Sequence, residues 1–382
     1  MDLIPEADKL DMIYSELNAM NARFDFFNEE LKWASGHFQS TLDNIENAWL
    51  KYSQIKQNNK ALESIFVPFY SQFVDSALVL HKLLTGKPQS LADVLAKKLR
   101  CHEKDVEEYF LYLNKLVCRG NTMDEKYYNL KGVNSDERKK LSSKIASESA
   151  LALFESHQKC VTNSHLFIKR DVLERIDDGI VHQEIADNIG KFLQKTYDRY
   201  EFMVVAFTSH NSKKHGMVRR HRLKGFTEVE RGSVTVAVAK QVKGSYSHVN
   251  KVKEAIKKCT LGLTADDMKK AIKDCGDQVL KTKVIETITA IHVYSDNHNT
   301  FLTSDNHVYT GRCGGRGFVI LIKSDEEIAL TDPGYTPKCD NLKCVNGEPE
   351  FVPNSLIAMC RCHYSFYGRL CEKSLKNCED SG

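Results

Sequence analysis

Half of the twelve cysteines lie between residues 339 and 378, and their spacing favours covalent crosslinking. Cys360-Arg361-Cys362 is followed after eight residues by Cys371, and Cys344 precedes Val345-Asn346-Gly347. Short segments that cannot bury enough apolar surface are held by disulfides, which persist in oxidising compartments. A zinc knuckle from Cys360, Cys362 and His363 is the alternative, although zinc sites favour wider gaps between cysteines. The tail is therefore predicted to be disulfide-bonded, and the protein extracellular.

A second cluster with chemical potential is the basic segment 209–227, which contains no acidic residue. Its cations are Lys213, Lys214, Arg219, Arg220, Arg222 and Lys224. Such a segment can bind glycan sulfates or anionic lipid headgroups and release their counterions. A solvated hairpin loop is the alternative, because runs of charge commonly face water. Its three histidines have no second ligand set at a diagnostic spacing, so no metal and no cofactor is predicted.

Residues 64–80 carry one charge, Asp75, and four aromatic side chains, which are Phe66, Phe69, Tyr70 and Phe73. A membrane-active protein can place such a segment in a bilayer interface. The alternative is a central helix that is apolar all round because other helices surround it. No stretch of the chain approaches the length of apolar sequence that a spanning helix needs.

Catalytic signatures are not apparent. Residues 311–317, Gly-Arg-Cys-Gly-Gly-Arg-Gly, resemble a phosphate loop but precede an expected strand instead of a helix, so we interpret them as a turn. Gly-x-Ser-x-Gly and His-Glu-x-x-His do not occur. The 54 basic and 51 acidic residues give a net charge of +3, which does not favour a nucleic-acid partner. We expect a protein that is not an enzyme.

The elements that must position these residues begin with helices. Apolar residues recur in steps of three and four from Leu10 to Leu31, and the stripe continues through Phe38, Leu42, Ile45, Trp49 and Tyr52. A second helix is expected over 62–84, bent near Pro68, and a third from Ser90, capped through Asp93, to Gly120. Helical periodicity returns over 136–200 with a break at 177–179. Together these predict a long antiparallel helical bundle.

The hydrophobic period then changes to that of strands. Strands are expected at 202–207, 234–238, 284–294 and 318–322, with two short helices at 249–258 and after Thr264. Prolines are absent from 89–332 and return from Pro333, which marks a loop-rich tail. The predicted fold class is α+β, mostly α, with a bundle at 1–200, an α+β domain at 201–335 and a disulfide module at 336–382.

The spacing Cys360-x-Cys362-x8-Cys371, with Phe366 and Gly368 in an aromatic-x-Gly turn, resembles the C-terminal half of an epidermal-growth-factor-like module. The resemblance implies the pairs Cys344–Cys360 and Cys362–Cys371. The module's third cysteine is missing, which leaves Cys339 for Cys378 or Cys313. The pairing of Cys101, Cys118, Cys160, Cys259 and Cys275 stays open.

The order of long helices from Leu10 to Tyr200, strands around a basic loop, and a cysteine tail resembles the secreted cephalotoxin and rapunzel-like animal proteins over about residues 8–240. That resemblance implies a secreted toxin-like effector that binds cell surfaces or membranes and is able to perturb them. The expected partners are then a cell-surface protein, a glycan or anionic lipid, with oligomers if membranes are the target. The alternative is a non-lytic extracellular protein that binds a receptor or glycan. Residues 1–6 show no signal peptide, so the source of an export signal stays open.

Overall fold

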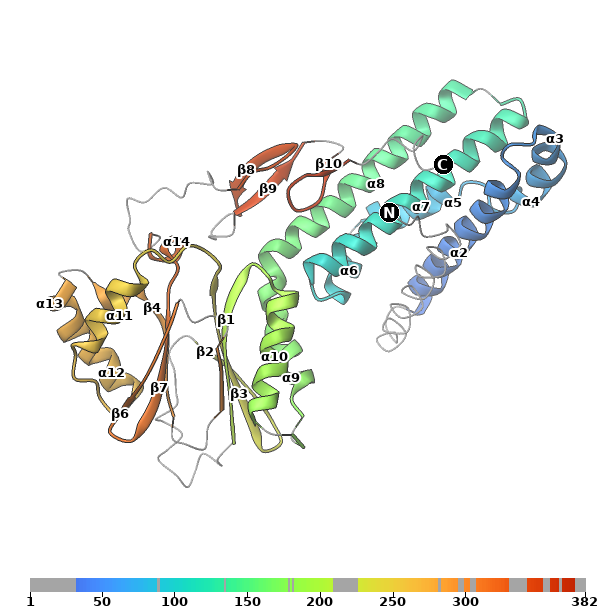
Figure 1. The fold of residues 1–382 in the computed structure, drawn as a ribbon. Helices are drawn as coiled ribbons and strands as arrows, with labels where there is room; N and C mark the ends of the chain where they lie inside the picture. Colours follow the sequence, from blue (N-terminus) through green and yellow to red (C-terminus); the bar gives the residue numbers. More distant parts are fainter. Residues whose placement is uncertain are drawn as a thin grey trace. The chain divides into compact units, whose positions relative to one another are not determined.

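The computed structural model describes residues 32–87, 90–133, 135–177, 179–180, 182–208, 226–280, 283–294, 299–302, 307–329, 342–352, 358–363 and 366–374. The chain forms two compact units. Unit 1 comprises 1–101, 105–158 and 373–382, and unit 2 comprises 102–104 and 159–372. These bounds differ from the expected divisions after residues 200 and 335. The expected class, α+β and mostly α, is confirmed, because long helices precede small antiparallel sheets (Figure 1).

Unit 1 is helical. Its elements are α2 (Lys32–Ile55), α3 (Asn59–Ala61), the π-helix η1 (Leu62–Phe66), α4 (Val67–Tyr70), α5 (Ser76–Thr85), α6 (Leu91–Lys98), and most of α7 (Glu103–Leu130) and α8 (Ser135–Asn163). The predicted stripe of α2 is confirmed, since Phe38, Leu42, Ile45 and Trp49 are all buried. The stretch from Leu10 to Leu31 lies outside the described residues.

Two expected helix boundaries in unit 1 are wrong. The second helix breaks at residues 71–75 instead of Pro68, which is accommodated in the first turn of α4. The third ends at Lys98, although Ser90 does accept the expected capping bond from the amide of Asp93. Gly120 lies inside α7, where an added Cβ would come within 2.8 Å of Ala77 on α5. That glycine therefore allows two helices to approach closely and does not end one.

Unit 2 begins with the 3-10 turn η2 (Ser164–Phe167), α9 (Ile168–Arg175) and α10 (His182–Thr196), then β1 (Tyr200–Thr208), β2 (Phe226–Arg231) and β3 (Val234–Val242). It continues with α11 (Val249–Lys257), α12 (Ala265–Ala271), the π-helix η4 (Ile272–Gly276), α13 (Asp277–Leu280), η5 (Val284–Thr287), β4 (Ile288–Tyr294) and β5 (Asn299–Leu302). The last elements are β6 (Val308–Cys313), β7 (Arg316–Ile322), α14 (Asp325–Ala329), β8 (Gly347–Phe351), β9 (Ala358–Cys362) and β10 (Phe366–Tyr367); the following β11 (Lys373–Ser374) belongs to unit 1.

The two main sheets of unit 2 share one plan. The first has strand order β2-β3-β1-β5 and the second β4-β7-β6, with antiparallel pairs throughout. In each sheet, the first strand, β1 or β4, follows a helical segment. Two later strands of the same sheet form a hairpin, β2–β3 or β6–β7, and the second strand of that hairpin pairs with the first strand of the sheet. Residues 313–316 form one hairpin turn, with positive φ at Gly314 and Gly315, as expected for residues 311–317.

The main core of unit 2 has three layers. Alternate residues of β1, such as Phe202 and Val204, pack with α10, while Met203 and Val205 pack with β4 and β7 of the second sheet. The far face of that second sheet packs on α11 and α12. The helix pairs thus cover the outer faces of two stacked sheets (Figure 1). Because both faces of these sheets are covered, the strands at 202–207 and 318–322 carry apolar side chains on both faces.

The hairpin of β8 and β9 shares this core. Val352 and Met359 are buried in the same cluster as α10 and β1, and the Arg199 guanidinium donates to the carbonyl of Ala358 at 3.0 Å. The hairpin is therefore packed against the rest of unit 2 and does not form a separate module.

Candidate functional site

The aromatic segment, which in the structure spans residues 62–75, has a buried side and a solvent-facing side. Phe66 and Tyr70 are fully buried, and their rings stack 4.9 Å apart. Phe69 and Phe73 are half-buried and meet edge to face at 5.2 Å, while Ile65 is 44% exposed. The segment is therefore amphipathic, and neither sequence interpretation describes all of it.

The backbone at both ends of the segment departs from regular helix. Residues 62–66 form the π-helix η1, a conformation that is rare and often occurs at functional sites. At the other end, Asp75 has a φ of +63°. A left-handed conformation costs a residue other than glycine about 1–2 kcal/mol. Surrounding contacts must hold the backbone here.

Asp124 of α7 supplies those contacts. One oxygen of its buried carboxyl accepts a hydrogen bond from the Tyr70 hydroxyl and another from the Asp75 amide, each at 2.9 Å. The Tyr70 hydroxyl also lies 3.4 Å from the carbonyl of Gly120. One carboxyl group thus fastens both the aromatic segment and the strained residue that ends it.

The side chain of Asp75 is held in turn. Arg138 of α8 lies 3.1 Å from one carboxylate oxygen, and the Tyr128 hydroxyl donates to the other at 3.2 Å. The Arg138 guanidinium carbon is 3.5 Å from the centre of the Tyr128 ring, a cation–π contact. We refer to Tyr70, Asp75, Asp124, Tyr128 and Arg138 as the Asp124 cluster.

Burial sets the electrostatics of this cluster. Desolvation raises the pKa of Asp124 to about 7, against the lowering effect of hydrogen bonds from Asp75 and Tyr70. The same desolvation, with the neighbouring carboxyl groups, raises the pKa of Tyr70 well above its ordinary value. The phenol therefore stays a donor at any physiological pH, and the carboxyl group is the member that changes charge.

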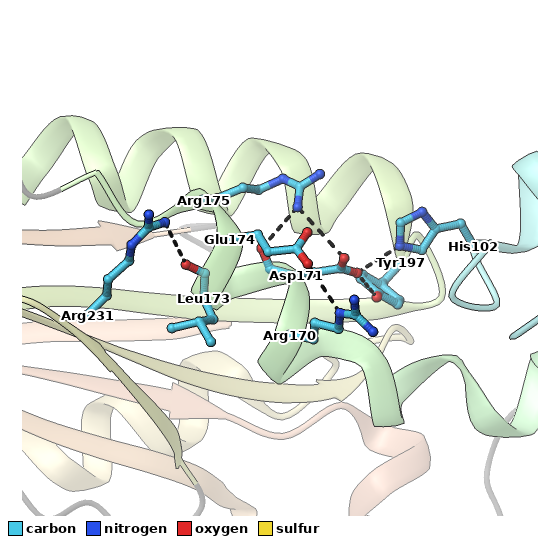
Figure 2. Close-up of polar contacts among 8 residues, drawn as sticks. All are labelled: His102, Arg170, Asp171, Leu173, Glu174, Arg175, Tyr197 and Arg231. Carbon is cyan, nitrogen blue, oxygen red and sulfur yellow. Dashed lines mark hydrogen bonds and ion pairs between the residues drawn. The ribbon is translucent and has the colours of Figure 1, made fainter. Parts of the chain in front are cut away.

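A second buried polar centre lies in unit 2 around Asp171 (Figure 2). Its fully buried carboxyl accepts a hydrogen bond from His102 at 2.7 Å and a very short one from the Tyr197 hydroxyl, while Arg175 lies 3.8 Å away. Arg175 also stacks on Phe192 at 3.3 Å. A carboxyl, an imidazole and a phenol are groups that can transfer protons, but here the contacts of His102 and Tyr197 with Asp171 join separate parts of unit 2 to α9. We assign this cluster a positioning role.

Three consecutive residues share that role at the start of α7. His102 binds Asp171, both carboxylate oxygens of Glu103 accept from Nε of Arg199 at 2.7 and 2.9 Å, and the Lys104 ammonium lies 3.3 Å from Asp198. Arg100 and Cys101, immediately before, have positive φ values. The chain thus enters unit 2 through two strained residues followed by three anchored ones.

The tail contains the two disulfides that the growth-factor resemblance implies, Cys344–Cys360 and Cys362–Cys371, and a third bond joins Cys259 to Cys275. The zinc-knuckle alternative is wrong, because Cys360 and Cys362 belong to different disulfides. Cys313 as partner of Cys339 is also wrong, because its thiol is free and lies 3.0 Å from the carbonyl of Leu261. Cys101, Cys118 and Cys160 are disulfide-bonded.

The other predicted site residues lie outside the described residues. These are the basic residues Lys213, Lys214, Arg219, Arg220, Arg222 and Lys224, and the tail cysteines Cys339 and Cys378. Their proposed roles are therefore carried by the sequence alone.

Asp124 and Asp171 were not predicted from the sequence. The signal for Asp124 was present, because Val106, Phe110, Leu113, Val117, Gly120 and Asp124 follow one another in steps of three and four. A carboxyl group in that series must face the buried side of the helix. We found no comparable pattern for Asp171, whose partners His102 and Tyr197 lie far from it in the sequence, just before α7 and just after α10.

Comparison with known proteins identifies the helical part of the chain. Residues 6–179 match the model of the cephalotoxin-like middle helical domain. No curated protein and no solved structure matches the chain. The matched residues include those of the aromatic segment and of the Asp124 cluster, and they overlap the range of about 8–240 over which the resemblance was expected. Over residues 6–179 the chain is therefore similar to the cephalotoxin-like proteins, in their middle helical domain.

Proposed function

We propose that this protein is a secreted toxin-like effector that acts on membranes through the aromatic segment. The supporting observation is the amphipathic segment 62–75, which begins with the π-helix η1 and ends at the left-handed Asp75. Its half-buried Phe69 and Phe73 and its exposed Ile65 form the side that is not packed in the core. The cephalotoxin-like domain and the several disulfides are consistent with an extracellular toxin-like protein.

The mode of contact that we propose is interfacial. Among the described residues, none of the helices is both long enough and apolar enough to cross a bilayer. Aromatic and aliphatic side chains can instead enter the boundary between headgroups and acyl chains, where basic residues contact anionic lipid. In this proposal Phe69 and Phe73 enter the interface, and the basic segment 209–227 binds the headgroups. Assembly of the helical unit as a bundle that oligomerises on the membrane is part of the same proposal.

The first prediction concerns vesicle leakage. We expect the wild-type protein to release dye from anionic vesicles at low salt and less at high salt, because salt screens the headgroup attraction. Phe69→Asp and Phe73→Asp should each lower release by about tenfold or more, since each loses burial worth roughly 1.5–3 kcal/mol. Dye fluorescence against protein concentration measures the effect.

A matched control is Leu151→Asp, which places the same charge on an exposed apolar residue of α8. This variant should release dye from the vesicles to the same extent as the wild type. An equal loss of dye release in all three variants would indicate a nonspecific effect of charge. Intact vesicles with wild-type protein under every condition would contradict the membrane proposal.

The second prediction tests the extracellular assignment through the cysteines. Protein from its natural source, alkylated without reductant and measured as an intact mass, should carry label on Cys313 and no label on Cys344, Cys360, Cys362 or Cys371. These four are closed in disulfides, whereas Cys313 is free and partly exposed. Full labelling of all twelve thiols would contradict an oxidising compartment.

A second candidate function is a non-lytic extracellular interaction protein whose growth-factor-like tail binds a receptor or glycan. The observation in its favour is an apolar pair on the tail surface, Val345 at 63% and Leu370 at 37% exposure, joined by the Val345 amide and the Leu370 carbonyl at 2.7 Å. Val345→Asp, with vesicles intact, should then abolish saturable binding to cells. This variant is preferable to deleting the tail, because Val352 and Met359 belong to the core of unit 2.

A further inference from the structure

We propose that Asp124 is a proton-operated latch: its neutral carboxyl group keeps segment 62–75 docked, and loss of its proton favours undocking. Undocking would free Leu62, Phe66 and Tyr70, which are fully buried, to join Phe69 and Phe73 in a membrane. This inference rests on the membrane function proposed above and adds a means of regulating it.

The geometry makes Asp124 a shared point of attachment for two groups. The Tyr70 hydroxyl and the Asp75 amide both donate to the same oxygen of its carboxyl group. Tyr70 belongs to the buried side of the segment, and Asp75 is the strained residue that ends it. A change at one carboxyl group is therefore felt both by the aromatic packing and by the hinge.

The irregular backbone at each end gives the segment boundaries at which to move. The π-helix η1 begins at Leu62, and the left-handed Asp75 precedes α5. Residues held in sparsely populated conformations relax when the surrounding contacts are lost. A loss of contacts at Asp124 would thus be confined to 62–75 and need not unfold α5 or α7.

The charged and titratable groups facing Asp124 are few. Tyr70 approaches from α4, Asp75 from the turn, Tyr128 from α7 itself and Arg138 from α8. Arg138 lowers the pKa of Asp124 and the Asp75 carboxylate raises it, while burial has the largest effect. An ionised Asp124 then places a buried negative charge beside the partly exposed carboxylate of Asp75, which already pairs with Arg138.

The direction of the pH effect follows from linkage. The pKa of Asp124 in the docked state, about 7, is above the ordinary aspartate value of 3.8, so the docked state binds the proton more tightly. The added stability is fully present below the pKa of the undocked carboxyl and is lost as the pH rises through about 7. Acid should therefore hold the segment, and neutral to mildly alkaline solution should release it.

Hydrogen exchange of the intact protein, measured by mass spectrometry, tests the latch without a membrane. Between about pH 5.5 and about pH 8, the docking equilibrium of 62–75 should fall by roughly thirtyfold in wild type, once the chemical exchange rate is divided out. Asp124→Asn keeps an acceptor oxygen but cannot ionise, so its protection should stay nearly constant. Burial lowers the pKa of His81 on α5, and any contribution of that histidine is common to both proteins. Equal pH dependence in the two proteins would overturn the latch.

A second variant keeps the test decisive if Asp124→Asn does not fold. The hydrogen bond from Tyr70 lowers the pKa of Asp124 and so stabilises the ionised carboxylate in the docked state. In Tyr70→Phe the docking equilibrium should therefore fall more steeply between the two pH values than it does in wild type. A fall no larger than that of wild type would overturn the proposal.

Vesicle leakage at the same two pH values separates the latch from the membrane function. Vesicles of phosphatidylcholine and phosphatidylglycerol keep their charge over this interval. Greater leakage at the higher pH in wild type, with little change in Asp124→Asn, supports both proposals. Release of 62–75 by exchange with vesicles intact at both pH values supports the latch and overturns the membrane function. Leakage without any pH-dependent exchange supports the membrane function and overturns the latch.

Discussion

Replacing Glu103 by alanine should destabilise unit 2 by about 3–5 kcal/mol, because it leaves a buried guanidinium without its carboxylate. The Arg199 side chain is 8% exposed, and both of its bonds to Glu103 run from the same nitrogen. Its remaining bond to the Ala358 carbonyl cannot neutralise the charge. Hydrogen exchange of the β1 amides should report the loss.

The measurement must distinguish the two units. The only tryptophans, Trp33 and Trp49, belong to unit 1, so their fluorescence should not report this change directly. Lys104→Ala is the matched control, since it removes the neighbouring ion pair with Asp198, in which the lysine is 62% exposed. Exposed pairs contribute up to about 1 kcal/mol. Equal effects of the two substitutions would contradict a buried role for Glu103. The double variant Glu103→Ala, Arg199→Met should recover much of the loss, because no unpaired charge remains.

Replacing Asp171 by alanine is expected to have a comparable effect. The change removes the acceptor that His102 and Tyr197 share, and a buried donor that loses its acceptor costs roughly 1–3 kcal/mol. We expect a loss of about 2–6 kcal/mol in the unfolding free energy of unit 2. Exchange of the α10 and β1 amides against denaturant concentration measures it.

Figure 2 contains the control for this experiment. Glu174 pairs with Arg170 one turn along α9 at 3.2 Å, and both side chains are about half exposed. Glu174→Ala should change stability by less than about 0.5 kcal/mol, as measured for exposed pairs on helices. A wild-type stability in Asp171→Ala would show that the cluster does not hold unit 2 together, and the positioning role assigned to it would fail.

Periodic features of the sequence predicted a large part of the fold. The buried stripe from Phe38 to Trp49, the caps at Ser90 and Thr264 and the strand at 202–207 are all present, because each depends on neighbours in the chain. Local rules failed where a distant contact decides. Gly120 resembles a helix end, yet it lies against Ala77, and Asp75 adopts its strained conformation only because Asp124 and Arg138 hold it.

The candidate site shows the same division. The four aromatic residues of 64–80 were evident as a cluster, but which of them are buried depends on helices far away in sequence. Phe66 and Tyr70 face the core, while Phe69 and Phe73 do not. The Asp124 cluster draws on four separate elements, and a pKa near neutrality arises only from burial in three dimensions. The membership of the cluster and the pKa of Asp124 could not be predicted from the spacing of residues along one helix.

The stacking of the two sheets has a consequence for how unit 2 unfolds. Their facing surfaces contain Ala237 and Ala239 of the first sheet and Ala290 of the second, which are buried where the sheets meet. Either half alone would leave such a surface in water. β5, which lies between β4 and β6 in the chain, pairs with β1 of the first sheet and so ties the halves together. We therefore expect the two sheets to open as one cooperative unit.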